Sequence, residues 1–265
     1  MQKYRYRKSY NTKKKISILK SKFFWFAILF FIVLGSIFYF FFLSSVFEIK
    51  EIKISGNQKI STQEIKDIIE EKINKKKLLF ISRNFFLIDI QEAKTIIEEF
   101  PAASKVILKR KFPNKVIVNV EERTPVGIWC QSDENCYYID KEGVIFEKTK
   151  DKRELVINSE REIIFGQRII EKKSLKDILE IHNELKDIEL DVQDFNILDQ
   201  GEKLVADMDR WEIYFNLLEN VSDQLFNLKL LLKEKIPPEQ RENLEYIDLR
   251  FGSRIFYRNK QIILD

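Results

Sequence analysis

An unbroken apolar run is the clearest pattern near the first residues of the chain. Residues 23–43 contain no charged side chain. As an α-helix with a rise of ~1.5 Å per residue, this run is ~31 Å long, close to the ~30 Å hydrocarbon core of a bilayer. A cleaved signal peptide is the alternative, but its apolar region usually holds only about 7–15 residues. We therefore predict a transmembrane helix that remains part of the protein.

Strand and helix patterns alternate in residues 46–124. Apolar residues at every second position predict strands, and apolar residues three and four positions apart predict helices. The strand pattern is carried by Phe47, Ile49, Ile52 and Ile54, by Val106 and Leu108, and by Val116, Val118 and Val120. The helix pattern is carried by Ile65, Ile68, Ile69 and Ile73 after the capping-box residues Ser61 and Glu64, and by Ala93, Ile96, Ile97 and Phe100 after Asp89. The order β-α-α-β-β predicts two helices on one face of a small sheet.

Residues 125–258 predict a second domain of mixed composition. Its signals are a turn at Asp140 and Gly143, a helix from Ser174 with Leu175, Ile178, Leu179, His182 and Leu185 facing inward, a hairpin around Asp209 and Arg210, and a helix with Leu225, Leu228 and Leu232 that ends before Pro237 and Pro238. We predict an α+β fold: one transmembrane helix, a β-α-α-β-β domain, and a mixed α/β domain with an antiparallel sheet. Residues 259–265 are predicted to be a short tail.

Charge is distributed unevenly along the chain. Residues 1–22 hold nine of the 46 Lys and Arg residues and none of the 42 Asp and Glu residues, so the remaining residues have 37 basic and 42 acidic groups. A basic segment next to a span stays on the cytoplasmic side. We therefore predict a cytoplasmic tail over residues 1–22 and an extracytoplasmic body. The mildly acidic body argues against a nucleic-acid binder.

The composition offers little material for catalysis or for a cofactor. The chain has one His, two Cys and seven Gly residues, and it lacks a nucleophile elbow, a phosphate-binding glycine loop and a zinc-binding His pair. His182 lies on the apolar stripe of its helix, where it is expected to be a packed residue. We expect no catalytic residue, no metal site, no cofactor and no small-molecule substrate.

The two cysteines are separated by a short polar segment. Cys130 and Cys136 flank a turn, and two nearby cysteines outside the cytoplasm can form a bridge. The alternative is a pair of free thiols. We predict a disulfide.

Three segments resemble a known family. They are residues 111–126, with an aromatic-Pro turn and a Glu-Arg-x-Pro exit, residues 138–146, with an Asp-x-x-Gly turn, and residues 246–257, which begin Tyr-Ile-Asp-Leu-Arg-Phe. In this order after a membrane span, they resemble the FtsQ/DivIB family of bacterial cell division proteins. That family combines a polypeptide-transport-associated (POTRA) domain with an FtsQ-type domain, which implies a POTRA domain at 46–124 and an FtsQ-type domain at 125–258.

The resemblance implies a function in cell division. It implies a non-catalytic scaffold of the divisome in the plasma membrane at the septum, with FtsB/DivIC-like and FtsL-like partners. The implied partner site is the last strand region, Arg250, Phe251, Gly252, Ser253, Arg254, Ile255, Phe256 and Tyr257. Core packing is the alternative role for Phe251 and Ile255. The alternative function is a POTRA-bearing secretion or envelope-assembly component. A membrane-anchored cell-wall enzyme is disfavoured because no catalytic constellation is recognisable.

Overall fold

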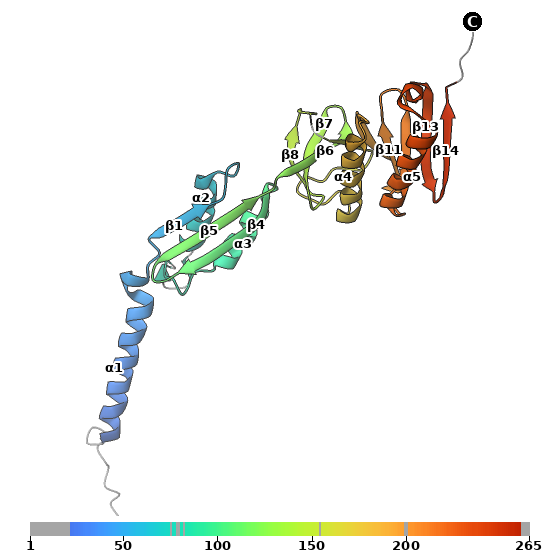
Figure 1. Ribbon diagram of the computed structural model, residues 1–265. Coiled ribbons are helices and arrows are strands. Elements are labelled where there is room, and N and C mark those ends of the chain that lie inside the picture. Colours follow the sequence, from blue (N-terminus) through green and yellow to red (C-terminus); the bar gives the residue numbers. More distant parts are fainter. Residues whose placement is uncertain are drawn as a thin grey trace, which may run out of the picture.

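A computed structural model describes residues 22–74, 76–77, 80–81, 83–153, 155–198 and 201–260, with the backbone alone at 76–77 and 80–81. The predicted basic tail, apart from Lys22, and residues 261–265 of the predicted C-terminal tail lie outside these ranges. A long helix, a small α+β unit and a larger sheet follow one another along the molecule (Figure 1). The predicted α+β class is confirmed.

Helix α1 spans Lys22–Leu43 and buries none of its side chains. It is the one helix among the described residues that is long and apolar enough to cross a membrane. At ~1.5 Å per residue its 22 residues are ~33 Å long. The predicted helix over the apolar run is therefore confirmed, and by length and composition it is a candidate membrane span. A short 3-10 helix, Ser45–Phe47, leads from it to the first domain.

The first domain has the predicted order of elements. It comprises β1 (Glu51–Ser55), α2 (Thr62–Asn74), α3 (Ile90–Glu98), β4 (Ala103–Lys111) and β5 (Lys115–Glu122), with a small ladder of β2 (Lys76–Lys77) and β3 (Phe80–Ile81) between the helices. The sheet order is β1-β5-β4, in which β1 and β5 are parallel and β4 and β5 are antiparallel. The central strand β5 is thus paired on both sides.

Local signals explain where these helices begin. Asp89 caps α3, because its carboxylate accepts hydrogen bonds from the backbone N–H groups of Gln91 (3.0 Å) and Glu92 (3.4 Å). The predicted start of this helix is confirmed. Residues four positions apart on α2 are buried with alternate residues of β5, and they belong to one core: Ile65, Ile69, Ile73, Val116, Val118 and Val120.

The distal domain is built on one nine-stranded sheet. Its strands are β6 (Pro125–Ser132), β7 (Asn135–Asp140), β8 (Ile145–Thr149), β9 (Val156–Ser159), β10 (Asp194–Leu198), β11 (Lys203–Asp207), β12 (Glu212–Asn216), β13 (Leu244–Phe251) and β14 (Arg254–Asn259). The order is β14-β13-β12-β11-β10-β9-β6-β7-β8. Helices α4 (Lys172–Asp187) and α5 (Val221–Glu234) pack their apolar faces into its core.

The sheet is mixed, which corrects the predicted antiparallel sheet. The pairs β9–β10 and β12–β13 are parallel, and so is the pair β6–β9. Helix α4 connects β9 to β10, and α5 connects β12 to β13. A crossover through a helix returns the chain to the same end of the sheet, so neighbouring strands joined in this way run parallel. The hairpin of β11 and β12 and the helices α4 and α5 were predicted, but strands β9 and β10 and the two β-α-β units were not.

The inward stripe of α4 also differs from the prediction. Leu175, Ile178, Ile181 and Leu185 are buried, whereas Leu179 and His182 are half-buried at the flank. His182 packs edge-on against Phe195, with ring centroids 6.1 Å apart. Burial of the imidazole lowers the pKa of His182. The side chain is therefore a packed residue, as expected.

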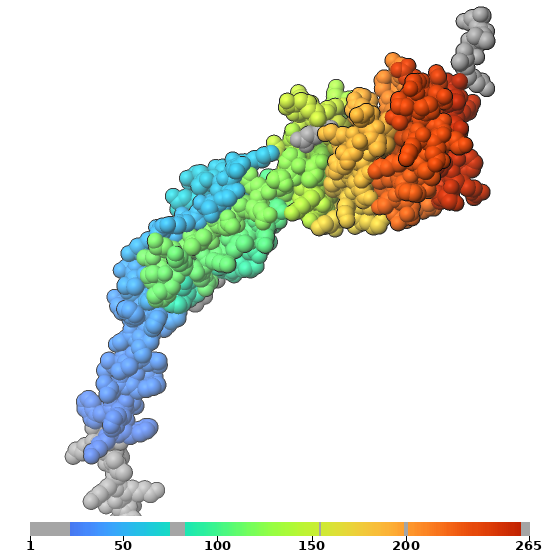
Figure 2. All heavy atoms as spheres, viewed as in Figure 1, coloured from blue at the N-terminus to red at the C-terminus, as the bar shows by residue number. Residues whose placement is uncertain are grey.

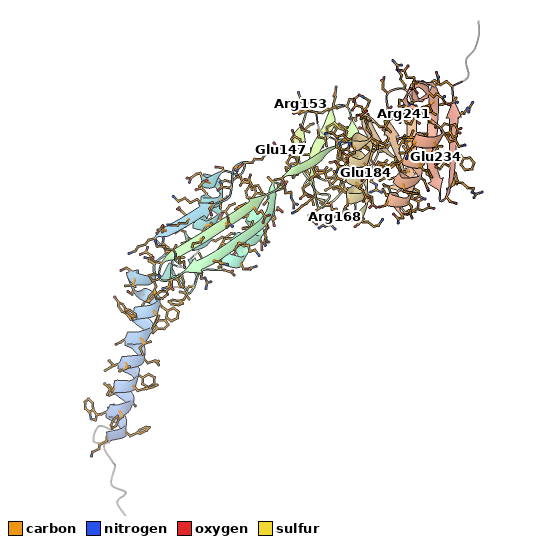
Figure 3. All side chains as sticks on the ribbon, in the orientation of Figure 1. Glu147, Arg153, Arg168, Glu184, Glu234 and Arg241 are labelled. Atoms are coloured by element: carbon orange, nitrogen blue, oxygen red, sulfur yellow. A yellow bond between two sulfur atoms is a disulfide. The ribbon has the colours of Figure 1, made fainter. Side chains whose placement is uncertain are left out.

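Two adjacent side chains at the junction of the domains contact the protein on either side of it. Glu122 ends β5, and its carboxylate accepts hydrogen bonds from the N–H groups of residues 58, 59 and 60 at 2.8–2.9 Å. Arg123 pairs with Asp140 of the distal domain at 2.5 Å, and the Asp140 side chain is 4% exposed. Lys59 also pairs with Glu147 of the distal domain, and Glu147 is labelled in Figure 3. Figure 2 shows the two domains adjoining one another end to end. Because β6 begins at Pro125, only two residues separate the domains.

Candidate partner-binding edge

The predicted partner site forms one hairpin at the end of the sheet. Arg250 and Phe251 end β13, Gly252 and Ser253 form the turn, and Arg254, Ile255, Phe256 and Tyr257 lie on β14. Gly252 adopts a φ of +64°, a conformation that favours glycine in a tight turn. The structure therefore brings all eight predicted residues together.

Strand β14 is an edge of the nine-stranded sheet. It pairs with β13 on one side, and among the described residues no strand pairs with its other side. It also lies at the end of the molecule far from α1 (Figure 1). An open edge presents backbone N–H and C=O groups that another strand can complete. Its chemistry is therefore that of strand addition, with main-chain bonds supporting affinity and side chains supporting selectivity.

The aromatic side chains on the hairpin are exposed. Phe251, Phe256 and Tyr257 are 48%, 49% and 46% exposed. The rings of Phe251 and Phe256 meet edge-on with centroids 5.3 Å apart. Ile255 is half-buried and packs against the domain core. The alternative role in the core thus applies to Ile255 but not to Phe251, and three rings remain available as anchors.

The two arginines of the hairpin differ in their surroundings. Arg250 forms two hydrogen bonds with the buried carboxylate of Asp248, at 2.9 Å and 2.7 Å. Arg254 is exposed at the start of β14. A charge that already has a buried internal partner contributes less to recognition than an exposed one, because its pairing would have to be broken. Arg254 is therefore the better candidate to meet an acidic partner residue.

A row of cations and rings extends from the hairpin across the neighbouring strands. Arg250 lies over the Tyr214 ring at 5.5 Å, Lys203 lies over the same ring at 4.2 Å, and Tyr214 stacks on Tyr246. Burial and the hydrogen bond to Glu212 raise the pKa of the Tyr214 hydroxyl, which therefore stays protonated. Sequence reasoning missed this row. The available signal was one tyrosine in each of two strand patterns, Tyr214 and Tyr246.

Ser253, one of the residues of the implied partner site, lies in the turn and not on the edge strand. Because β14 begins at Arg254, the Ser253 N–H belongs to the turn between the paired residues Phe251 and Arg254. The open edge is offered by β14 alone.

Cys130 and Cys136 occupy opposite positions on β6 and β7, at the other end of the sheet from the hairpin. In the structure their sulfur atoms are bonded, with an S–S distance of 2.06 Å, and both residues are buried. Within the described ranges, no group of three His, Cys, Asp or Glu side chains is arranged to hold a metal ion. The oxidation state of the cysteines in the exported protein stays a prediction.

Comparison with known proteins places the first domain. The family described as "POTRA domain, FtsQ-type" matches residues 47–123. Cell division protein DivIB of Clostridium acetobutylicum is 34% identical over 104 residues, which are 39% of this chain and 38% of that protein. Cell division protein FtsQ of Syntrophotalea carbinolica is 26% identical over 107 residues, 40% of this chain and 34% of that protein. The matched segment thus spans little more than a third of either relative.

One further match extends beyond the POTRA domain. Cell division protein FtsQ of Hahella chejuensis is 24% identical over 192 residues, which are 72% of this chain and 62% of that protein. A match of 192 residues is longer than residues 1–123, so it includes part of the distal domain.

The span, the POTRA domain and the distal sheet define a membrane-anchored POTRA protein with one apolar helix. The relatives narrow this class further, since all three carry the names FtsQ or DivIB. The chain is thus similar to the bacterial cell division proteins FtsQ and DivIB, and its residues 47–123 match the FtsQ-type POTRA domain.

Proposed function

We propose that this protein is a non-catalytic scaffold of the divisome, which binds its partners outside the cytoplasm and supports septum formation. The open edge of β14 is the observation that carries the proposal. In this arrangement the residues before α1 are cytoplasmic, and the domains at 46–124 and 125–258 are extracytoplasmic. The basic residues before the span support this orientation.

The proposed partners are division proteins of the FtsB/DivIC and FtsL type. A strand of the FtsB/DivIC-like partner adds to β14 through main-chain hydrogen bonds. Phe256 and Tyr257 of β14 anchor the partner strand, because large rings contribute most of the binding energy of many interfaces. Arg254 meets an acidic residue of the partner. The partner strand would become the tenth strand of the sheet.

The alternative is a POTRA-bearing component of secretion or envelope assembly. Such a protein would use the POTRA domain as its main contact, and the edge of β14 would be incidental. The names of the relatives favour cell division. The two functions also predict different positions in the cell, since a division scaffold gathers at midcell.

The test combines position in the cell with binding. A fluorescent fusion of the full chain should form a midcell band in dividing cells, and the double variant Phe256→Ala/Tyr257→Ala should reduce capture of the FtsB/DivIC-like protein by the full chain. Phe165→Ala is the matched control, because Phe165 is also about half exposed (51%) but lies away from the hairpin. Uniform membrane fluorescence would exclude a division scaffold. Undiminished capture by the double variant would exclude this edge.

A further inference from the structure

A group of phenylalanine rings lies where α1 meets the POTRA domain. We call Phe47, Phe85, Phe86 and Phe112 the aromatic collar. Their rings contact one another and the end of the span, with centroids 5.6 Å apart for Phe47 and Phe112, 6.0 Å for Phe85 and Phe112, 5.2 Å for Phe47 and Phe86, and 5.4 Å for Phe41 and Phe47. The collar is therefore continuous with the lipid-facing surface of α1.

A polar side chain of the POTRA domain fixes the collar to the helix end. Asn84 is 6% exposed, and its amide donates hydrogen bonds to the carbonyl oxygens of Phe41 (2.8 Å) and Phe42 (3.3 Å). These carbonyls belong to the last turn of α1, where no helical N–H group is left to satisfy them. The backbone N–H of Phe85 donates to the Phe47 carbonyl oxygen at 2.8 Å. The POTRA domain is thus attached directly to the end of the span.

Only part of the collar is covered by protein. Phe47 and Phe85 are 3% and 9% exposed, whereas Phe86 is 39% and Phe112 is 65% exposed. Exposed rings next to one another form an apolar surface that water disfavours. Their position at the C-terminal end of a membrane-spanning helix identifies what covers them.

The length of α1 sets the depth of the collar. Its ~33 Å are close to the ~30 Å hydrocarbon core, and the headgroup layers bring a bilayer to ~40–45 Å in total. Each headgroup layer is therefore about 5–7 Å thick. Phe86 packs on Phe41 and Phe42 of the last turn of α1, so its ring lies within this layer. Phe112 packs on Phe47, four residues beyond the end of α1, and continues the same apolar surface.

The charge around the collar fits lipid headgroups. Residues 47–51, 83–89 and 110–115 contain five basic residues (Lys50, Arg83, Arg110, Lys111 and Lys115) and three acidic residues (Glu48, Glu51 and Asp89), a net charge of +2. Basic residues close to a membrane surface attract anionic lipids. Apolar rings surrounded by basic side chains are typical of surfaces that bind at the membrane interface.

We propose that the collar end of the POTRA domain is a second membrane contact, in which Phe86 and Phe112 insert into the headgroup layer at the C-terminal end of α1. The occupant is lipid and not another protein. The contact limits tilting of the POTRA domain about the end of the span. This inference goes beyond partner binding and does not depend on which protein binds β14.

The test uses tryptophan fluorescence of the full chain in nanodiscs of pure lipid. Phe112→Trp and Phe86→Trp are introduced separately in a Trp25→Phe background, and lipids brominated on their acyl chains serve as quenchers. Phe226→Trp on α5 is the matched control, because Phe226 is 67% exposed and lies in the distal domain. The native Trp129 and Trp211 are buried in the distal core, so they contribute equally to every variant.

We expect the added emission at positions 112 and 86 to be blue-shifted and quenched by brominated lipid, while that at position 226 is neither. If emission at position 112 shows the same wavelength and the same quenching as the control, the proposal is overturned. Because the nanodiscs contain no other protein, that result would leave a protein partner as what covers the exposed rings. Circular dichroism checks that each variant is folded. If one collar variant fails this check, the other is read alone against Phe226→Trp, and the absence of both the blue shift and the quenching again overturns the proposal.

Discussion

Two neighbouring residues at the junction, Glu122 and Arg123, contact different domains. Glu122 faces back and holds the loop before α2 through three backbone N–H groups. Arg123 faces forward and pairs with Asp140, which also accepts hydrogen bonds from the N–H groups of Glu142 and Val144. The Glu-Arg-x-Pro sequence therefore ends one domain and anchors the next.

Glu122 predicts a pH dependence of stability. Burial alone would raise its pKa, but the hydrogen bonds from Ile60, Lys59 and Gln58 outweigh burial, and the pKa lies below its ordinary value of 4.5. A carboxyl with a depressed folded-state pKa stabilises the protein above its unfolded pKa, and that stability is lost as the pH falls through the folded pKa. We expect Glu122→Gln to flatten the decline in POTRA-domain stability below a pH of about 4.5.

This effect is measured on the full chain in micelles between pH 3 and 7. Hydrogen exchange of residues 47–123 during thermal unfolding reports on the stability of the POTRA domain. Glu98→Gln is the control, because Glu98 ends α3 and makes an i,i+4 ion pair on its surface. Equal pH profiles for Glu122→Gln and the unaltered chain would contradict the prediction.

Arg123→Ala should destabilise the distal domain. The substitution leaves the Asp140 carboxylate buried without its cation, and removal of one member of a buried ion pair typically costs ~3 kcal/mol or more. Urea unfolding followed by the fluorescence of Trp129 and Trp211 reports on this domain, because both rings are in its core. Arg153→Ala is the control, since the Arg153 side chain is 88% exposed and should cause a much smaller loss. Equal losses for the two variants would show that the Asp140 pairing is not stabilising.

At the scale of elements, the β6–β7 hairpin carries the cysteine pair. We expect Cys130 and Cys136 to resist alkylation in the exported protein until a reductant is added, which mass spectrometry of the labelled peptides would detect. The loop between them is short, so the bridge is expected to contribute ~2 kcal/mol, on an entropic account. The double variant Cys130→Ser/Cys136→Ser should lose this amount in urea unfolding. Quantitative labelling without reductant would refute the bridge.

Sequence patterns predicted elements better than they predicted connections. The alternating valines of β5 and the Asp89 cap of α3 were readable because each pattern is local. The parallel pairs β9–β10 and β12–β13 were missed, because alternating burial, as in β10 and β12, does not indicate the direction of the neighbouring strand. The direction follows from the path of the chain through α4 and α5.

The candidate site was predicted by resemblance, and its local geometry was not. Residues 250–257 were expected on an edge, and they do form the terminal hairpin of the sheet. Ser253 was misplaced because the turn is only two residues long, and a shift of one or two positions changes which N–H groups face outward. The row of Lys203, Tyr214 and Tyr246 depends on the pairing of three strands, so no single segment reveals it.

At the scale of the whole molecule, the proposed topology makes the body accessible from outside. Protease added to intact spheroplasts should degrade residues 44–265, because the basic residues before α1 keep that end in the cytoplasm. Immunoblotting against an N-terminal tag should reveal a short protected fragment. A cytoplasmic protein serves as the control for membrane integrity. Full protection of residues 44–265 would contradict the proposed topology.

The end-to-end order of α1, POTRA domain and distal sheet has a consequence for any partner in the same membrane. The edge of β14 lies at the far end of the molecule from the span (Figure 1). Asn84 bonds the POTRA domain to the end of α1, and Arg123 pairs with Asp140 of the distal domain. Both junctions are therefore held by side-chain contacts, which favours a rigid connection over a flexible one. In a partner with a single span, the segment between that span and its pairing strand must therefore be long enough to reach β14. Shortening that segment by whole helical turns should abolish pairing even if every contacting residue is unchanged.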